Sequence, residues 1–206
     1  MSHTKDSLLT LSKRFDQALL YAHQLHREQL RKETAIPYIT HLMSVCALVL
    51  EHGGDEDQAI AALLHDAAED QGGQATLDEI RKTYGTRVAK IVEVCTDTVV
   101  TPKPPWKARK EAYITHLKEA PKDAFLVSMA DKVHNARSIL ADLRTQGDDL
   151  WKRFSGGKDG TLWYYRALSD AFRAIRPGVL QQELERTVAE LELIAFSRGH
   201  YAKKVL

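Results

Sequence analysis

The sequence is poor in cysteine and has no long hydrophobic run. Cys46 and Cys95 are its two cysteines, and no CxxC pair or disulfide framework is present. Both lie in apolar stretches, which favours buried, reduced thiols and a reducing compartment. The N-terminal residues MSHTKDSLLTLSKRF lack the apolar region of a signal peptide, and no run approaches the ~18 apolar residues of a membrane span. We therefore expect a cytoplasmic protein with no membrane partner.

An excess of charge of either sign is also missing. The 29 basic and 28 acidic side chains leave a net charge of +1, so nothing indicates general affinity for nucleic acid or an anionic membrane. A small anionic ligand needs only a local basic patch, which this balance permits. A length of 206 residues, 44% of them hydrophobic, suits one domain with a core large enough to hold a pocket. We expect a single domain over residues 1–206.

Alternating, strand-like patterns are scarce, and apolar residues recur at helical spacing. The sequence therefore predicts an all-α helical bundle, with a core at about 10–145 and C-terminal helices within about 158–200. Glycine pairs and the segment TPKPP separate the helices, because neither continues a helix. Thr76 and Glu79 have the spacing of a capping box and predict a helix that opens at residue 76. The other expected helices cover about 7–30, 38–51, 56–69, 88–96, 106–119, 122–143, 161–175 and 180–197.

Polar residues end the most apolar of these helices. The run AIAALL leads directly into His65 and Asp66, and a buried histidine beside a buried carboxylate needs partners. Glu69 and Asp70 follow one turn later, and i,i+4 spacing would place them on the faces of His65 and Asp66. Three carboxylates crowded at one helix end raise each other's pKa values unless a positive group joins them. The pattern therefore predicts either a metal ion or arginines at this point.

A His-Asp pair by itself is a weak signal, because the dipeptide is common by chance. Here a further histidine, His41, lies 24 residues before the pair, and an aspartate, Asp131 of the stretch ADKVHN, lies 65 residues after it. Taken together, these residues favour a metal site.

The stretch GDEDQAIAALLHDAAED, with IPYITHL before it and MADKVHN after it, resembles the HD hydrolase domain of the Rel/SpoT alarmone enzymes. It is most similar to their stand-alone members, the small alarmone hydrolases, over about residues 10–145. The resemblance implies that His41, His65, Asp66 and Asp131 bind a divalent ion, and that the ion is Mn²⁺. A set of two nitrogens and two oxygens suits Mn²⁺ or Fe²⁺ at least as well as Zn²⁺.

The resemblance also implies roles for neighbouring residues. Glu69 and Asp70 match a pair that positions or activates the attacking water, and we expect Glu69 to carry the proton with Asp70 as its helper. Asn135, four residues after Asp131, is expected to contact the substrate near the ion. His134 is expected to lie on a different face of the helix, at the surface.

Two basic stretches are candidates for substrate binding. Arg31 and Lys32 match a basic pair that contacts the purine base. Many relatives carry glycine before the following Pro-Tyr, where this chain has Ala35-Ile36. The second stretch, beside Trp106, could bind a pyrophosphate tail and comprises Lys103, Lys107, Arg109 and Lys110, although a solvated helix N-terminus is the competing interpretation. The aromatic residues of the C-terminal third, among them Tyr164 and Tyr165, are expected in the core or at an interface.

The leading functional hypothesis is metal-dependent hydrolysis of the 3′-pyrophosphate of guanosine alarmones, (p)ppGpp, to GDP or GTP and pyrophosphate. Two alternatives stay open. The first is another purine nucleotide as substrate, such as an adenosine alarmone or NADPH. The second is a non-catalytic alarmone sensor. The expected partner is a small nucleotide, and a homo-oligomer is left open.

Overall fold

The computed structural model describes residues 9–98, 100 and 102–202, and the side chains among them up to residue 197. These residues form α-helices joined by short loops, with no strand among them, so the all-α prediction is confirmed. No helix of the described residues is long and apolar enough to cross a membrane. The elements in chain order are α1 Lys13–Leu25, α2 Ile39–Glu51, α3 Glu56–Leu64, α4 Ala67–Asp70, α5 Gly73–Tyr84, α6 Thr86–Cys95, α7 Trp106–Glu119, α8 Lys122–Gln146, the 3-10 helix η1 Gly147–Arg153, α9 Gly157–Ile175 and α10 Val179–Ala202.

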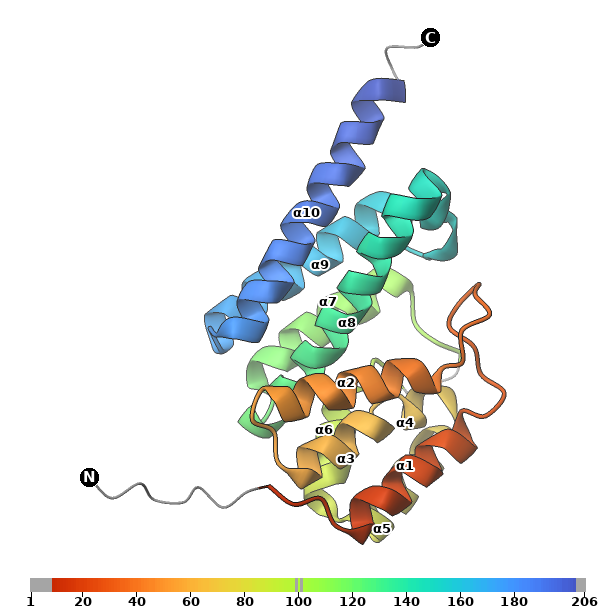
Figure 1. Cartoon of the computed structure of the whole chain (residues 1–206), viewed down its shortest axis with the longest axis vertical. Helices are drawn as coiled ribbons and strands as arrows, with labels where there is room; N and C mark the ends of the chain where they lie inside the picture. Colours follow the sequence, from red (N-terminus) through yellow and green to blue (C-terminus); the bar gives the residue numbers. More distant parts are fainter. Residues whose placement is uncertain (1–8, 99, 101, 203–206) are drawn as a thin grey trace, which may run out of the picture.

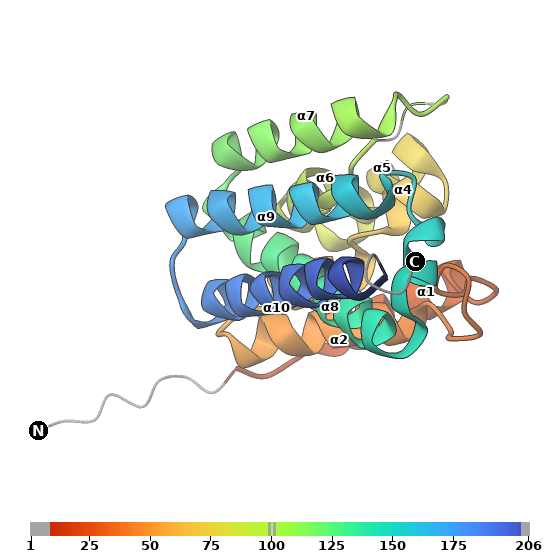
Figure 2. The ribbon, with the colours of Figure 1, turned by 90° about the horizontal axis from the view of Figure 1, so that it is seen from above.

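The long helix α8 lies at the centre of the bundle (Figures 1 and 2). Its N-terminal half packs against α2, α3 and α6, and η1 and α10 pack along its remaining length. Residues 124–131 of α8 are all buried, which is the pattern of a helix enclosed on every side. The helix α7 packs on α9, on the side of the bundle away from α2 (Figure 2).

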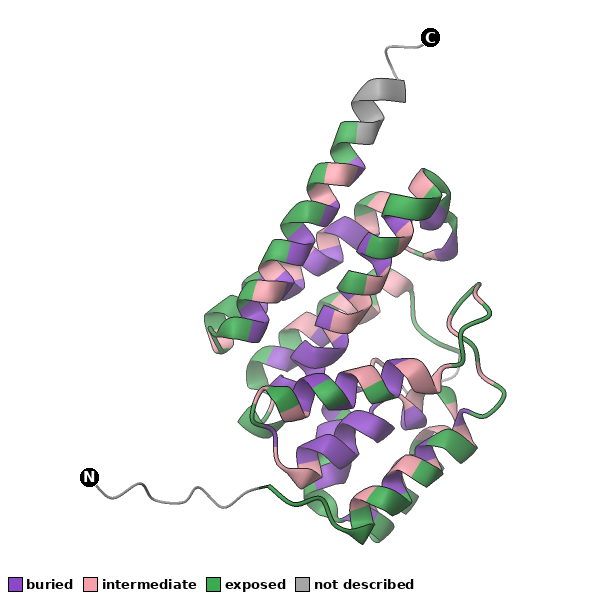
Figure 3. Ribbon diagram, viewed as in Figure 1, coloured by how far each residue is buried: buried purple, intermediate pink, exposed green. Residues whose placement is uncertain are grey.

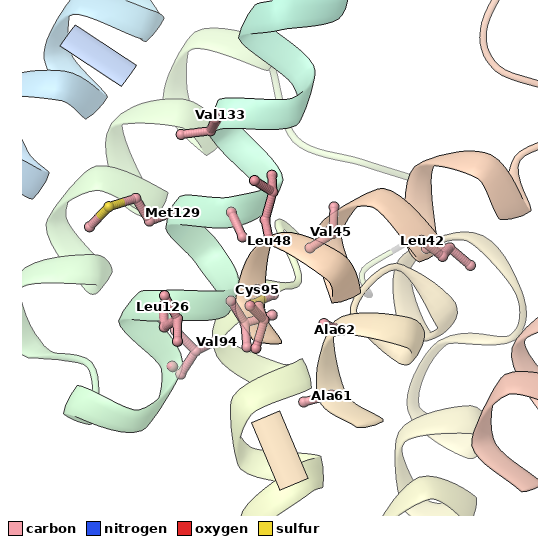
Figure 4. Close-up of a cluster of buried hydrophobic side chains, with 14 of the residues drawn as sticks. Leu42, Val45, Leu48, Ala61, Ala62, Val94, Cys95, Leu126, Met129 and Val133 are labelled. Carbon is pink, nitrogen blue, oxygen red and sulfur yellow. The ribbon is translucent and has the colours of Figure 1, made fainter. Parts of the chain in front are cut away.

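The core around α8 is made of branched side chains packed on small ones. Figure 4 shows Val45 and Leu48 of α2 near Ala62 of α3, with Cys95 of α6 close by, whereas Met129 of α8 points away from α2. Alanines on α3 let neighbouring helices approach closely, and residues 58–65 are all buried (Figure 3). Close packing of this kind fixes the end of α3, and therefore His65, relative to α8.

The first helix is shorter than the predicted 7–30 at both ends, because α1 begins at Lys13 and ends at Leu25; residues 7 and 8 of the prediction lie outside the described residues. The chain then folds back on itself in a loop over residues 29–38. Leu30 and Pro37 form an isolated bridge, and Arg31 N donates to Ile36 O at 2.8 Å. These backbone bonds compete with continued helix and fix the loop that carries the predicted basic pair.

The third predicted helix is wrong in one respect that matters for the site. It was expected to run through the His-Asp pair, but α3 ends at Leu64 and α4 begins at Ala67. The predicted capping box is also wrong. The helix α5 begins at Gly73, and Thr76 lies within it, donating from Oγ1 to Gln71 O at 2.9 Å. Gly72 and Gly73 take positive φ values of 134° and 63°, which glycine permits, and so reverse the chain before α5.

Candidate metal centre

Four side chains from three parts of the chain meet beside α8. His41 lies in the first turn of α2, His65 and Asp66 lie at the break between α3 and α4, and Asp131 lies in the middle of α8. Nε2 of His41 is 3.5 Å from Asp66 Oδ2 and 3.3 Å from Asp131 Oδ1. Nε2 of His65 is 3.0 Å and 3.6 Å from the same two oxygens. The four residues that the resemblance implied are therefore brought together.

The donor atoms fit a divalent ion. Nε2 of His41 and Nε2 of His65 are buried, and neither makes a hydrogen bond within the described part of the chain. Such an atom is costly unless a partner such as a metal ion satisfies it. The ligand atoms of His41, His65 and Asp66 all lie within 4.8 Å of one another. Atoms that bind one ion at about 2.0–2.2 Å lie roughly 3 Å apart, which agrees with the separations here.

The remaining atoms of the ligands are held by other groups. His65 Nδ1 donates to Ala62 O at 2.8 Å, so Nδ1 carries a proton and Nε2 is the nitrogen available to a metal ion. Tyr38 donates from its hydroxyl to Asp66 Oδ2 at 2.6 Å. Burial, and then the charge of Asp66, raise the pKa of Tyr38, so this hydroxyl stays a donor.

The electrostatics of the cluster call for a cation. Burial opposes ionisation of Asp66 and Asp131, yet the facing histidines, with Lys132 beside Asp131, hold the pKa of both carboxyls well below their usual range. Burial also opposes protonation of His65, but the two carboxylates outweigh it and raise its pKa well above the ordinary value. The two carboxylates thus favour a positive charge between His41 Nε2 and His65 Nε2. A divalent ion bound there would supply that charge.

The predicted carboxylate pair lies beside this cluster. Glu69 accepts from Asp97 N at 3.1 Å and pairs with Lys103 Nζ at 2.9 Å. Asp70 accepts from Gln29 Nε2 at 2.8 Å. The surrounding protein, and then the charge of Asp66, raise the pKa of Asp70. Both carboxylates line a cavity of about 210 Å³ that also reaches Asp66, so either is placed to exchange a proton with a molecule held there.

A larger cavity of about 780 Å³ adjoins the small one. Its volume is in the range of pockets for molecules of nucleotide size, roughly 300–1,000 Å³. The side chains that line both cavities include Arg31, Asp70, Lys110, Lys132, Asn135 and Tyr164. A ligand in the large cavity can therefore extend one end into the smaller cavity beside Asp66, past several cationic groups.

The predicted substrate-binding residues divide into two groups. Arg31 and Lys32 line the large cavity, and Asn135 lines both. Lys107 and Arg109 line neither. The Lys107 ammonium lies over the Trp163 ring, and the Arg109 guanidinium is bound by Asp97 and by Pro104 O.

Of the basic residues predicted near Trp106, Lys110 lines both cavities. Two further residues of the site were not predicted to belong to it. Tyr164, on α9, also lines both, and its buried hydroxyl has no hydrogen-bond partner among the described residues. His134 is half-buried, and its Nδ1 lies 2.8 Å from His41 Nδ1. Burial, with His41 and Arg31 nearby, lowers the pKa of His134 to about 4, so its ring is neutral at pH 7. Its i,i+3 spacing from Asp131 was the available signal.

The helical bundle and its buried cluster of two histidines and two aspartates define a metal-binding domain of the HD type. The family model described as "HD domain" matches residues 18–162, which is more than half of the chain. The chain therefore belongs to the HD domain family.

Two relatives and one solved structure illustrate the proteins to which the chain is similar. The chain is 36% identical over 126 residues to the guanosine-3′,5′-bis(diphosphate) 3′-pyrophosphohydrolase MESH1 of Xenopus tropicalis, covering 60% of this chain and 68% of that one. It is 35% identical over 122 residues to MESH1 of Homo sapiens, covering 58% and 65%. A solved structure of a metazoan orthologue of SpoT, described as hydrolysing ppGpp, superimposes with a TM-score of 0.74 and 25% identity over 88% of this chain and 97% of that one.

Proposed function

We propose that this protein is a metal-dependent hydrolase that removes the 3′-pyrophosphate of guanosine alarmones, (p)ppGpp, to give GDP or GTP and pyrophosphate. The observation that carries the proposal is the cluster of His41, His65, Asp66 and Asp131 at the end of a cavity lined by cationic side chains. The relatives named as 3′-pyrophosphohydrolases support the same reaction.

The bound ion would be held by the four residues of the cluster, and Mn²⁺ is our choice because the set mixes imidazole with carboxylate and lacks thiolate. When bound, the ion lowers the pKa of a water and neutralises charge on the phosphoryl group. We also propose that the reaction takes place in the cytoplasm, since both cysteines are buried and unpaired, as is usual in a reducing compartment.

The chain's own residues would bind the nucleotide and manage the proton. Arg31 and Lys32 hold the base, and Asn135 holds the sugar end near the cluster. The water oxygen bonds to the phosphorus on ribose O3′, the P–O3′ bond breaks, and pyrophosphate leaves the nucleoside. Glu69 accepts the proton that the water loses, with Asp70 beside it, and the released O3′ takes up a proton. Lys110 and Lys132 offset the negative charge of the departing pyrophosphate.

The decisive experiment is anion-exchange analysis of ppGpp incubated with the purified protein, with and without Mn²⁺. The expected result is Mn²⁺-dependent formation of GDP and pyrophosphate in equal amounts. Asp66→Ala is expected to lose bound metal, measured by elemental analysis, and at least about a thousandfold in rate, since the ion contributes several kcal/mol and about 1.4 kcal/mol corresponds to tenfold.

A panel containing an adenosine alarmone and NADPH tests the substrate assignment, because Ala35-Ile36 alter the loop that carries the basic pair. Preference for either over ppGpp would replace the guanosine assignment. Tight binding of ppGpp without turnover in Mn²⁺ would favour a sensor.

A further inference from the structure

Two imidazole rings meet beside the proposed metal site, on the side of His41 that faces away from Asp66 and Asp131. His41 Nδ1 and His134 Nδ1 are 2.8 Å apart, and the ring centroids are 4.8 Å apart. One proton is shared between two such nitrogens, because each atom of a neutral pair is either the donor or the acceptor. One ring therefore donates to the other. The direction decides whether His41 Nε2, the nitrogen that faces the cluster, carries a lone pair or a proton.

The surroundings of His41 set this direction. Its Nε2 is buried, faces oxygens of Asp66 and Asp131 at 3.3–3.5 Å, and makes no hydrogen bond with acceptable geometry within the described residues. A divalent ion held between these oxygens and Nε2 would take the Nε2 lone pair, which leaves the proton of the neutral ring on Nδ1. With the proton on Nδ1, that atom donates to His134 and the Nε2 lone pair points at the place where His65 Nε2 also points.

We propose that His134 is a positioning residue that holds His41 in the Nδ1–H tautomer and orients its Nε2 lone pair toward the ion. His134 Nδ1 is the acceptor that His41 needs, as Ala62 O is for His65. The inference rests on the metal site of the proposed function, but it concerns ion binding and does not depend on which nucleotide is hydrolysed.

The position of His134 explains why it can act on His41 so directly. His134 lies one turn from Asp131 on α8, so one helix supplies both a ligand and the acceptor for another ligand. The rings of His41, His65 and Tyr38 pack around the same point, with centroids 5.1–5.6 Å apart. This packing limits rotation of the His41 ring. What is left to be determined is which of its two nitrogens carries the proton.

The test compares His134→Phe, which keeps a planar ring but removes the acceptor, with His134→Asn, whose side-chain oxygen takes the place of Nδ1. Mn²⁺ affinity of the whole protein is measured by titration calorimetry. Loss of such outer partners typically costs about 10–100-fold in metal affinity, and we expect that loss for the Phe variant and under about threefold for Asn. His116→Phe, on the exposed face of α7, is the matched control and should leave affinity unchanged.

A second measurement needs no substitution at the site. Nitrogen-15 NMR of the protein loaded with Zn²⁺, a diamagnetic substitute for Mn²⁺, reports which ring nitrogen of His41 carries the proton, and we expect Nδ1 in the wild type. Protonation at Nε2, or wild-type Mn²⁺ affinity in His134→Phe, would overturn the inference. A wild type that binds Mn²⁺ in this way but leaves ppGpp intact would overturn the proposed function and retain the role of His134.

Discussion

The Arg31 guanidinium donates from Nη2 to Asn135 Oδ1 at 2.7 Å, across 104 residues of chain. Asn135 in turn donates from its side-chain nitrogen to Asp131 Oδ1. The loop that would bind the base is thereby joined, through one amide, to a carboxylate of the metal cluster. A nucleotide that draws Arg31 toward its base would also free the Asn135 oxygen beside the reacting phosphate.

Arg31→Met is expected to raise KM about tenfold or more and to change kcat little. The substitution keeps most of the side-chain length but removes the donors, and a hydrogen bond to a charged group contributes about 1.5–3 kcal/mol. Steady-state kinetics with ppGpp measures the effect. Arg27→Met, on the exposed surface just after α1, is the control. An unchanged KM would remove Arg31 from the substrate site.

Glu69→Gln is expected to lower kcat by about 10²–10⁴, the usual contribution of a general base. The amide oxygen can still accept from Asp97 N, so the local fold is retained. Mn²⁺ affinity should stay at the wild-type value, which separates this variant from Asp66→Ala. Asp70→Asn should lose less; a larger loss there would exchange the roles of the two carboxylates.

The pH dependence of kcat/KM should report Lys110. Burial, and then the charge of Lys132, lower the pKa of Lys110 to about 8. The side chain is cationic below that pH and neutral above it, so binding of an anionic phosphate weakens as pH rises through about 8. Lys110→Met should remove this limb at a lower overall rate, and Lys110→Arg should move it to higher pH. A wild-type profile flat from pH 7 to 9.5 would contradict the assignment.

Tyr164→Phe should reduce substrate affinity without reducing stability. The Tyr164 hydroxyl has no hydrogen-bond partner in the described part of the chain, so removing it costs the fold little, within about 0.5 kcal/mol. Tyr113→Phe is the comparison, because its hydroxyl lies 2.6 Å from Ser128 Oγ and its removal should cost about 1 kcal/mol. Thermal unfolding of both variants measures the two losses of stability. An equal loss of stability would show a structural role for the Tyr164 hydroxyl.

Helix type and order could be predicted from the sequence because they depend on local periodicity and on glycine and proline. The bounds of α7, Trp106–Glu119, agree with the prediction, and α8 begins at Lys122 as expected. The break at His65 and Asp66 could not be predicted in this way, since both residues are compatible with helix. It depends on long-range packing that holds α3 beneath α2 and α8.

The same limit applies to the site. His41, His65, Asp66 and Asp131 could be named together because motifs mark each of them. The choice among the basic residues of α7 depends on the rotation of that helix about its axis, which packing against α9 fixes. Lys110 therefore replaces Lys107 at the cavity. The prediction that His134 lies at the surface is wrong, because its i,i+3 spacing from Asp131 brings its ring against His41.

The walls of the large cavity come from widely separated parts of the chain, the loop 29–38, α8, and η1 with the start of α9. The ligand set that we propose for the ion ends at residue 131, whereas Arg153, Phe154 and Thr161 belong to the later wall. Substitutions in η1 and α9 can therefore alter the shape of the cavity while the four metal ligands stay in place. The residues proposed to bind the ion and those that form the far wall of the cavity are thus encoded in separate parts of the chain, so a change in substrate preference does not require a change in the ligand set.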